Sequence, residues 1–285
     1  MNPIDACIHP DGGAALVAAQ TLTDGNFAPT EQWVAEERPV ALVYNGVSHA
    51  VMLASPLDLE DLALGFSLTE GIIESPAELL DFEQHDSDVG ITLDLRVTLR
   101  CFMRLKERRR TLAGRTGCGL CGTESLDEAI RPVRRTVSPP PVGPAAVRRA
   151  MNDLGSSQVL QPSTGGTHAA AWCGLDGAVR LVREDVGRHN ALDKLIGAMV
   201  RADLDPTAGF IVATSRASYE MVFKTATAGV GLLATISAPT ALAVRTAQTA
   251  GLCLIGFARG TRGVVYSHGD VLSGAAAPVQ SNGIG

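Results

Sequence analysis

Hydrophobic and polar positions near the start of the chain alternate between a strand-like and a helix-like spacing. The segment PVALVYNGVSHAVMLA, residues 39–54, consists of two apolar runs that are separated by Asn45 and Gly46. Because this dipeptide tolerates positive φ and suits tight turns, the segment predicts a β-hairpin. After Pro56, apolar residues share one helical stripe and predict a helix that packs on a sheet. The stripe consists of Leu59, Leu62, Ala63 and Phe66.

The next segment, residues 95–106, has apolar residues at every second position, which predicts a strand with Cys101 on its buried face. We interpret the polar, glycine-rich stretch that follows, residues 106–124, as a long loop. Residues 1–30 show neither spacing, and we expect them to be loosely ordered.

The second half of the chain is more regular. Residues 178–185 predict a strand, and Asn190 is expected to cap the helix that follows. Residues 209–229 predict a strand, a loop and a helix, and residues 232–262 repeat that order and end on a third strand. Alternating β and α units of this kind predict an α/β fold with a parallel sheet covered by helices.

A proline run divides the two halves. The segment SPPPVGP, residues 138–144, cannot form a central strand or the interior of a helix. We therefore predict a smaller N-terminal α+β domain over residues 31–137, a Pro-rich linker over residues 138–144 and a C-terminal α/β domain over residues 145–285.

Composition and charge exclude several classes of protein. The 24 basic and 30 acidic residues give a net charge of −6, which argues against a nucleic-acid coat or a membrane-surface binder. The first residues have no basic n-region and no apolar core, so we expect no signal peptide. Six cysteines in 285 residues do not resemble a disulfide framework, and we expect a reducing, cytoplasmic environment. The uncharged run 225–244 contains glycine and proline and is interpreted as soluble secondary structure and not as a membrane span.

Three loops follow the predicted parallel strands and should meet at one edge of the sheet. They are SRAS (215–218), SAPT (237–240) and ARGTR (258–262). Hydroxyl residues at helix N-termini together with Arg216, Arg259 and Arg262 favour an anion site, for example for a phosphate. Ordinary helix caps and surface arginines would explain the same pattern equally well.

The pair Cys118 and Cys121 lies in the most positive part of the chain, since residues 96–135 contain eleven basic and four acidic residues. A structural zinc site would need a second pair of ligands at standard spacing, which the sequence lacks. A zinc deaminase would need a glutamate where Ala170 stands. A dithiol redox centre remains open. A sulfur carrier also remains open, because nearby arginines favour a thiolate and flanking glycines allow the loop to reach partners.

Several motifs together resemble a known family. They are GCGLCG (117–122), TGGTHAAA (164–171), REDVGRHNALDKLIG (183–197), SRASYEMVFKTATAGV (215–230) and IGFARG (255–260). This set, in this order, resembles the formate dehydrogenase accessory sulfurtransferase family, FdhD.

The resemblance implies a sulfurtransferase that takes persulfide sulfur from a cysteine desulfurase. Its acceptor is the bis-molybdopterin guanine dinucleotide molybdenum (or tungsten) cofactor, which GDP mimics in part, before that cofactor enters formate dehydrogenase. It further implies a C-terminal domain like the cytidine-deaminase fold but without its zinc, a mobile CxxC loop and a homodimer. Cys118 would carry the persulfide and Cys121 would assist. The implied cofactor-binding residues are Phe257, Ala258, Arg259, Gly260, Thr261 and Arg262, to which we add Arg216 and His189.

Some residues have a second interpretation. His189 and Arg188 precede a helix, where they could face a cofactor or only fix the local chain, and His168 is similar. Glu184 and Asp185 could simply fix Arg188. A chaperone that only holds the guanine dinucleotide cofactor, or a CxxC dithiol redox protein, remains the alternative function.

Overall fold

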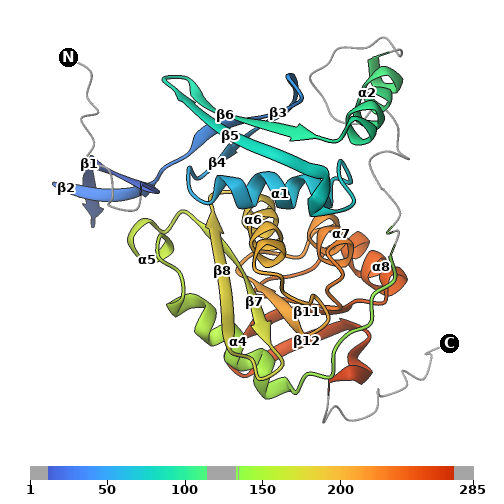
Figure 1. The fold of residues 1–285 in the computed structure, drawn as a ribbon. Helices are drawn as coiled ribbons and strands as arrows, with labels where there is room; N and C mark the ends of the chain where they lie inside the picture. Colours follow the sequence, from blue (N-terminus) through green and yellow to red (C-terminus); the bar gives the residue numbers. More distant parts are fainter. Residues whose placement is uncertain (1–11, 114–132, 134, 273–285) are drawn as a thin grey trace. The chain divides into compact units, whose positions relative to one another are not determined.

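The computed structural model describes residues 12–113, 133 and 135–272. The chain divides into two compact units (Figure 1). The first comprises residues 1–134, 157–171 and 181–204, and the second comprises residues 135–156, 172–180 and 205–285. Neither unit is a single stretch of sequence, because two segments after the proline run group with the N-terminal part.

The first unit begins with a two-stranded hairpin, β1 (Ala14–Thr23) and β2 (Asn26–Ala35), whose residues pair in antiparallel register throughout. Asp24 and Gly25 form its turn with positive φ values of 50° and 83°. The prediction of loose order is therefore wrong for residues 14–30, while residues 1–11 lie outside the described part. The periodicity was absent because most residues of both strands are exposed or half-buried, so neither face needs to be apolar.

A four-stranded sheet follows in the order β4-β3-β6-β5, with β3 and β6 parallel and the other pairs antiparallel. Its strands are β3 (Arg38–Tyr44), β4 (Val47–Ala54), β5 (Leu79–Ser87) and β6 (Gly90–Val97). Asn45 and Gly46 form the turn between β3 and β4 with φ values of 48° and 77°. The predicted hairpin is confirmed.

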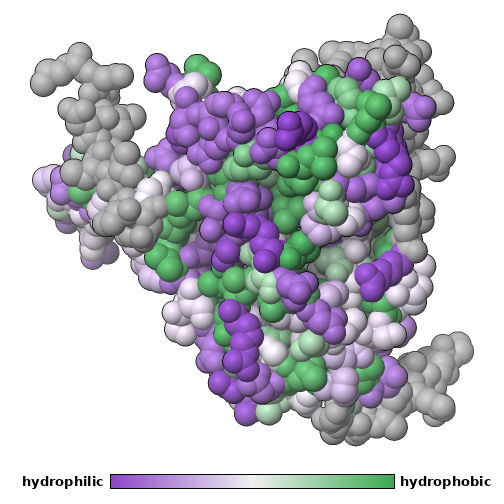
Figure 2. All heavy atoms as spheres, in the orientation of Figure 1, coloured by the Kyte–Doolittle hydropathy of each residue, from purple (hydrophilic) through white to green (hydrophobic). Residues whose placement is uncertain are grey.

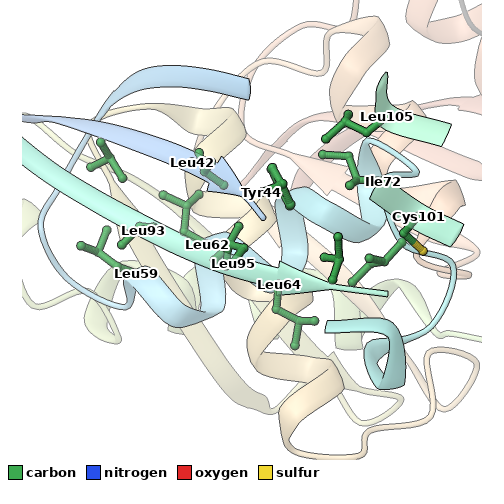
Figure 3. Packing of buried hydrophobic residues seen from close by; sticks show 14 of the residues in the cluster. Leu42, Tyr44, Leu59, Leu62, Leu64, Ile72, Leu93, Leu95, Cys101 and Leu105 are labelled. Atoms are coloured by element: carbon green, nitrogen blue, oxygen red, sulfur yellow. The ribbon is translucent and has the colours of Figure 1, made fainter. Parts of the chain in front are cut away.

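The core of the first unit lies between this sheet and two helices, α1 (Leu59–Thr69) and α2 (Leu99–Ala113). A short 3-10 helix, η1 (Pro76–Glu78), precedes β5. Figure 3 shows Leu42, Leu62 and Leu95 converging from β3, α1 and β6. The predicted helix after Pro56 is confirmed, and its apolar stripe faces the sheet.

Helix α2 corrects two predictions. Strand β6 ends at Val97, and the residues that follow are helical and not extended. Cys101 is buried as expected, but Leu99 and Met103 are exposed, because the buried pair Cys101 and Leu105 follows a helical i, i+4 spacing. Residues 106–113, for which the sequence predicts a loop, continue this helix.

Helix α1 packs closely on α6 (Arg188–Arg201), which also belongs to the first unit. A Cβ atom on Gly65 would lie 1.8 Å from the carbonyl oxygen of Asp193, and one on Gly197 would lie 2.0 Å from that of Asp61. Both glycines are thus needed for the close approach of the two helix backbones. The first unit also contains α5 (Gln161–Thr164).

The larger sheet has six strands in the order β12-β11-β10-β9-β7-β8. They are β7 (His168–Gly174), β8 (Val179–Asp185), β9 (Gly209–Ala213), β10 (Leu232–Thr235), β11 (Cys253–Arg259) and β12 (Arg262–Ser267). Strands β9, β10 and β11 are parallel, which confirms the predicted α/β arrangement. The last strand, β12, returns antiparallel to β11.

Three helices of the second unit pack on this sheet. They are α4 (Pro144–Ser156), α7 (Tyr219–Thr227) and α8 (Ala241–Ala250), and a short 3-10 helix, η2 (Gly269–Val271), follows β12. Helix α4 contacts β9 and β11, whereas α7 and α8 contact each other and also touch β10 and β11, respectively. The expected resemblance of this layer to the cytidine-deaminase fold stays a prediction.

The proline-rich segment forms neither helix nor strand up to Gly143, as its composition predicts, and Pro144 begins α4. It packs within the second unit, because Val137 N donates to Ala250 O at 2.8 Å and Val142 is fully buried. A Cβ atom on Gly231 would lie 2.3 Å from Ser138 O. The segment is therefore a fixed part of this unit.

Among the described residues, no helix is both long enough and apolar enough to span a membrane. On the face shown in Figure 2, hydrophobic residues lie in patches between hydrophilic ones.

Candidate functional site

Three of the six cysteines are described, and all three are unsuited to carry sulfur between proteins. Cys101, Cys173 and Cys253 are free thiols that are completely buried. Burial raises the pKa of Cys173 and of Cys253 to about 12, so both thiols are protonated at neutral pH. A persulfide partner needs an accessible thiolate, which these sites do not offer.

The predicted carrier Cys118 and its neighbour Cys121 lie outside the described residues, as does the rest of the CxxC loop from residue 114. Their roles stay predictions. Within the described part of the chain, no group of three or more His, Cys, Asp or Glu residues is arranged to hold a metal ion.

The loops that follow β9, β10 and β11 meet at one edge of the sheet, because these strands run parallel. Backbone hydrogen bonds join them. Ala217 N donates to Ala238 O at 3.3 Å, and Thr240 N donates to Ala217 O at 3.0 Å. The loop after β10 is tied to β11 in turn, since Phe257 N donates to Ser237 O at 3.2 Å. The three predicted loops therefore form one connected edge.

A cavity of about 300 Å³ lies beside the β11–β12 hairpin. Five of the eight predicted cofactor-binding residues line it, namely Ala258, Arg259, Gly260, Thr261 and Arg262. Its other walls are mainly apolar and include Val147 and Met151 of α4 with Ile255 and Val265 of the hairpin. This combination of apolar walls and a few polar groups is typical of small-molecule sites.

Arginines supply the charge of the cavity. Arg148 of α4 lines it together with Arg259 and Arg262, and none of the three pairs with a carboxylate in the part of the chain that the structure describes. Arg259 Nε donates to Ile236 O at 3.1 Å, which holds this side chain against the loop after β10. Three guanidinium groups without a counter-ion around one cavity favour an anionic ligand.

The wall formed by α4 was missed at the sequence level. Val147 and Met151 stand four residues apart, as on one face of a helix, and Arg148 follows the first of them. That spacing could have indicated an amphipathic helix. It could not have indicated that the helix packs against β11, which depends on the folding of the proline-rich segment.

Two further predicted residues of the second unit lie near this edge but do not line the cavity. Phe257 has a positive φ of 51° at a bulge in β11, and the residue is 43% exposed. A left-handed conformation is uncommon for an aromatic residue and marks a locally constrained site. Arg216 is exposed on the loop after β9.

The eighth predicted residue, His189, belongs to the first unit, where α6 begins earlier than expected. Gly187 is the N-cap, so Arg188 and His189 are the first two helical residues and Asn190 is not the cap. The Asn190 side chain instead donates to Leu53 O at 2.8 Å and to Asp185 Oδ1 at 3.0 Å. These bonds fix the first turn of α6 to β4 and to the end of β8 within the first unit.

Asp185 does not fix Arg188 but forms a buried ion pair with Lys194. The Lys194 Nζ to Asp185 Oδ2 distance is 2.7 Å, and neither side chain is exposed. Ser55 completes the network, because its carbonyl accepts from Lys194 at 2.9 Å and its amide donates to Asp185 at 3.0 Å.

Glu184 also has a structural role and no bond to Arg188. Its carboxylate accepts from the amides of Val159, Leu160 and Gln161 at the start of α5. It also accepts from the Thr167 hydroxyl at 3.0 Å. The acidic pair of the motif REDVGRHNALDK therefore holds the first unit together.

Comparisons with known proteins agree with this fold. The model of the FdhD/NarQ family matches residues 35–273. A protein of Bordetella petrii named Sulfur carrier protein FdhD is 55% identical over 94% of this chain and 92% of its own length. A protein of the same name from Cupriavidus necator is 56% identical over 92% of this chain and 93% of its own.

A solved structure from Desulfotalea psychrophila, described as that of a candidate formate dehydrogenase accessory protein, is similar in fold. It has a TM-score of 0.70 and covers 91% of this chain and 99% of its own, at 20% identity. Both the family model and the relatives span nearly the whole described chain. The chain belongs to the FdhD/NarQ family.

Proposed function

We propose that this protein is a sulfur carrier that serves formate dehydrogenase in the cytoplasm. It accepts sulfur from a cysteine desulfurase on Cys118 and transfers it to the bis-molybdopterin guanine dinucleotide molybdenum cofactor, its substrate, before that cofactor enters the dehydrogenase. The observation that carries most of the proposal is the identity of 55% to a protein named as a sulfur carrier over 94% of the chain.

The chemistry assigned to Cys118 is a thiolate exchange. The Cys118 thiolate attacks the outer sulfur of the desulfurase persulfide, a new S–S bond forms on Cys118, and the desulfurase cysteine leaves as a thiolate. No oxidant or reductant is required. Cys121 can later attack the Cys118 persulfide, which releases the outer sulfur as sulfide and leaves a disulfide. The burial of all three described thiols supports this assignment, since it removes them as competing acceptors.

The cavity beside the β11–β12 hairpin supports the cofactor half of the proposal. Guanine dinucleotide carries pyrophosphate groups, and Arg148, Arg259 and Arg262 supply unneutralised positive charge around the cavity. The exposed ring of Phe257 offers a stacking face for a base at the same edge. We assign one guanine nucleotide of the cofactor to this cavity, for which GDP is a suitable probe.

Intact-mass spectrometry tests the sulfur half. The full chain is incubated with a cysteine desulfurase and cysteine, and a mass gain of one sulfur atom is expected. Cys118→Ala should lose this gain and should also fail to support maturation of formate dehydrogenase. Cys7→Ala is the matched control and should keep both.

Two results would separate the proposal from its alternative. A Cys118→Ala variant that still matures the dehydrogenase would exclude sulfur transfer through this residue. If GDP then still bound, with affinity that depends on Arg259, the protein would be a chaperone that only holds the cofactor.

A further inference from the structure

Helix α2 of the first unit has a buried side and an exposed apolar side. Cys101 and Leu105 are buried in the core of this unit. Leu99 and Met103 are 72% and 47% exposed and also stand four residues apart. Because an α-helix turns by about 100° per residue, these two pairs lie on opposite sides of α2. The first pair holds the helix on the core, and the second faces the solvent.

Ion pairs fix α2 without the help of the exposed pair. Arg100 donates to the Glu78 carboxylate of η1, and Arg104 donates to the Glu74 carboxylate and to Ile72 O, the latter at 2.9 Å. These contacts join the helix to the segment between α1 and β5, while α2 itself follows β6 (Figure 1). The exposed apolar side chains are therefore presented on a helix whose position is set by other contacts.

The chain becomes positively charged from α2 toward Cys118. Residues 106–115 contain five basic residues and one acidic residue, a net charge of +4. The first of them, Lys106, lies beside the exposed pair on the same helix, with its ammonium 4.6 Å from the centre of the Phe102 ring. An apolar contact that is bordered by positive charge fits a partner surface with an apolar centre and an acidic rim.

The short connection between α2 and Cys118 indicates which partner this is. The helix ends at Ala113, and Cys118 follows five residues later, which is at most about 18 Å of extended chain. A protein that brings a sulfur atom to Cys118 must therefore approach within that distance of the end of α2. A protein of ordinary size covers about 800 Å² at an interface, which is enough to include the exposed side of the helix.

We propose that the exposed side of α2, formed by Leu99, Met103 and Lys106, is the docking site for the cysteine desulfurase that donates sulfur to Cys118. This inference rests on the proposed function, because it names the surface that the sulfur donor uses, and it adds no chemical step to the thiolate exchange. The donor contacts Leu99 and Met103 with apolar side chains and Lys106 with a carboxylate. We call this surface the α2 docking face.

Binding of a cysteine desulfurase to the immobilised full chain, measured by biolayer interferometry, tests the α2 docking face. The double variant Leu99→Ser and Met103→Ser should weaken binding by about tenfold or more, because two apolar side chains no longer become buried in the complex. The matched control is Val51→Ser with Leu53→Ser, which removes two apolar residues of β4 in the same unit that are 66% and 54% exposed. Equal losses in both double variants, or no loss in the first, would overturn the proposal.

The charge at the α2 docking face has its own measurement. Lys106→Glu should weaken desulfurase binding by roughly threefold or more, and the affinity of the unchanged chain should fall as the salt concentration rises. Tighter binding by Lys106→Glu would overturn the acidic partner surface that the proposal requires.

Sulfur transfer from two donors separates docking from chemistry. Glutathione persulfide is small and needs no docking surface, so it should load Cys118 of the Leu99→Ser, Met103→Ser variant as fast as it loads the unchanged chain. The desulfurase should load this variant more slowly at low protein concentration. Slower loading from both donors would overturn the proposal, since the variant would then have damaged the reaction at Cys118. If neither donor loads the unchanged chain, the proposed function fails, and desulfurase binding still decides the docking face.

Thermal melting and sedimentation exclude other effects of the variants. Leu99→Ser and Met103→Ser should leave the melting temperature nearly unchanged, because both residues are exposed. If the double variant does not fold, Met103→Ser alone decides, and unchanged desulfurase affinity there overturns the proposal. A change in the oligomeric state of the double variant would also overturn it, since the face would then join two copies of this chain.

Discussion

The two units of this protein use charged residues in opposite ways. In the first unit, several charged side chains are buried and paired. Asp185 with Lys194 is fully enclosed, and Asp61, which is 2% exposed, accepts from Arg183 and Arg201 at 2.8 and 2.9 Å. In the second unit, strands β9 and β10 carry no charged residue, and three arginines surround a cavity without carboxylate partners among the described residues.

The difference separates charges that hold the fold from charges that are available to a ligand. A buried charge that loses its partner is left in a medium that solvates it poorly, so its removal lowers the free energy of unfolding. An arginine at the edge of a cavity loses little when it is removed, because water already solvates it. Substitutions in the first unit should therefore change stability, and those at the cavity should change binding.

The largest effect is expected for Lys194→Met. It leaves the Asp185 carboxylate buried without its counter-ion and removes the bond to Ser55 O. We expect the free energy of unfolding to fall by about 3–5 kcal/mol. Urea unfolding followed by circular dichroism measures this change.

Two companions sharpen that result. Lys106→Met removes a half-buried lysine whose ammonium lies 4.6 Å from the Phe102 ring, and it should cost no more than about 1 kcal/mol. Adding Asp185→Asn to Lys194→Met should recover part of the loss, because no uncompensated charge then remains. A double variant that is as unstable as the sum of its parts would show that the two residues act separately.

The next effect concerns the contact between α1 and α6. Gly65→Ala places a Cβ atom 1.8 Å from Asp193 O, so the helices must separate, and we expect a loss of about 2–3 kcal/mol. Gly155→Ala in α4 is the control, since its Cβ atom meets nothing within 4 Å. That variant should be neutral or more stable by up to about 1 kcal/mol. Chemical unfolding of both variants checks the pair.

A smaller, pH-dependent effect is expected at Glu78 of the first unit. The amide of Glu74 and the guanidinium group of Arg100 both donate to the Glu78 carboxylate and lower its pKa from 4.5 to about 2. Because the folded pKa is the lower one, this stabilisation is complete above pH 4.5 and is lost as pH falls toward 2. Glu78→Gln should cost about 1 kcal/mol at pH 7 and nothing near pH 2.

The control for this pH dependence is Glu60→Gln. Glu60 is half-exposed and pairs with Arg201 at 3.0 Å on the surface. Its loss should be within about 0.5 kcal/mol at either pH. Unfolding in urea at pH 7 and pH 2.5 compares the two variants, and equal losses for Glu78→Gln at both values would contradict the assignment.

Sequence patterns predicted best those elements whose local spacing is decided by one buried face. The β3–β4 hairpin and α1 were found in this way, as were the βα units from β9 to β11. The sequence predicts a strand for residues 99–105, whereas the structure has a helix there. The buried positions Cys101 and Leu105 are four residues apart, which fits both the two-residue period of a strand and the i, i+4 spacing of a helix in so short a segment. The β1–β2 hairpin was missed because its faces are mostly exposed and carry no apolar signal.

The candidate site shows the same division. The hairpin residues 258–262 could be assigned from the order of the strands and the resemblance, because they are contiguous in sequence. The wall formed by Arg148 and Met151 could not, because a long-range packing contact places it there. The sequence predicts that Glu184 and Asp185 fix Arg188 only because the three residues are close in sequence. In the structure, the partners of both acidic residues lie elsewhere in the first unit.

The smallest effect on stability, and the sharpest test of the contrast, is expected for Arg259→Gln. Arg259 loses only one bond, from Nε to Ile236 O, at an exposed position, so the free energy of unfolding should change by less than about 0.5 kcal/mol. The affinity for GDP, by contrast, should fall by about tenfold, since a charged donor is removed from the cavity. Arg245→Gln, an exposed arginine on α8 that does not line the cavity, should leave both quantities unchanged. Isothermal titration with GDP and urea unfolding of the same preparations compare the two variants. If Arg259→Gln instead lowered stability as Lys194→Met does, the arginines of the second unit would hold the fold too, and the contrast between the two units would fail.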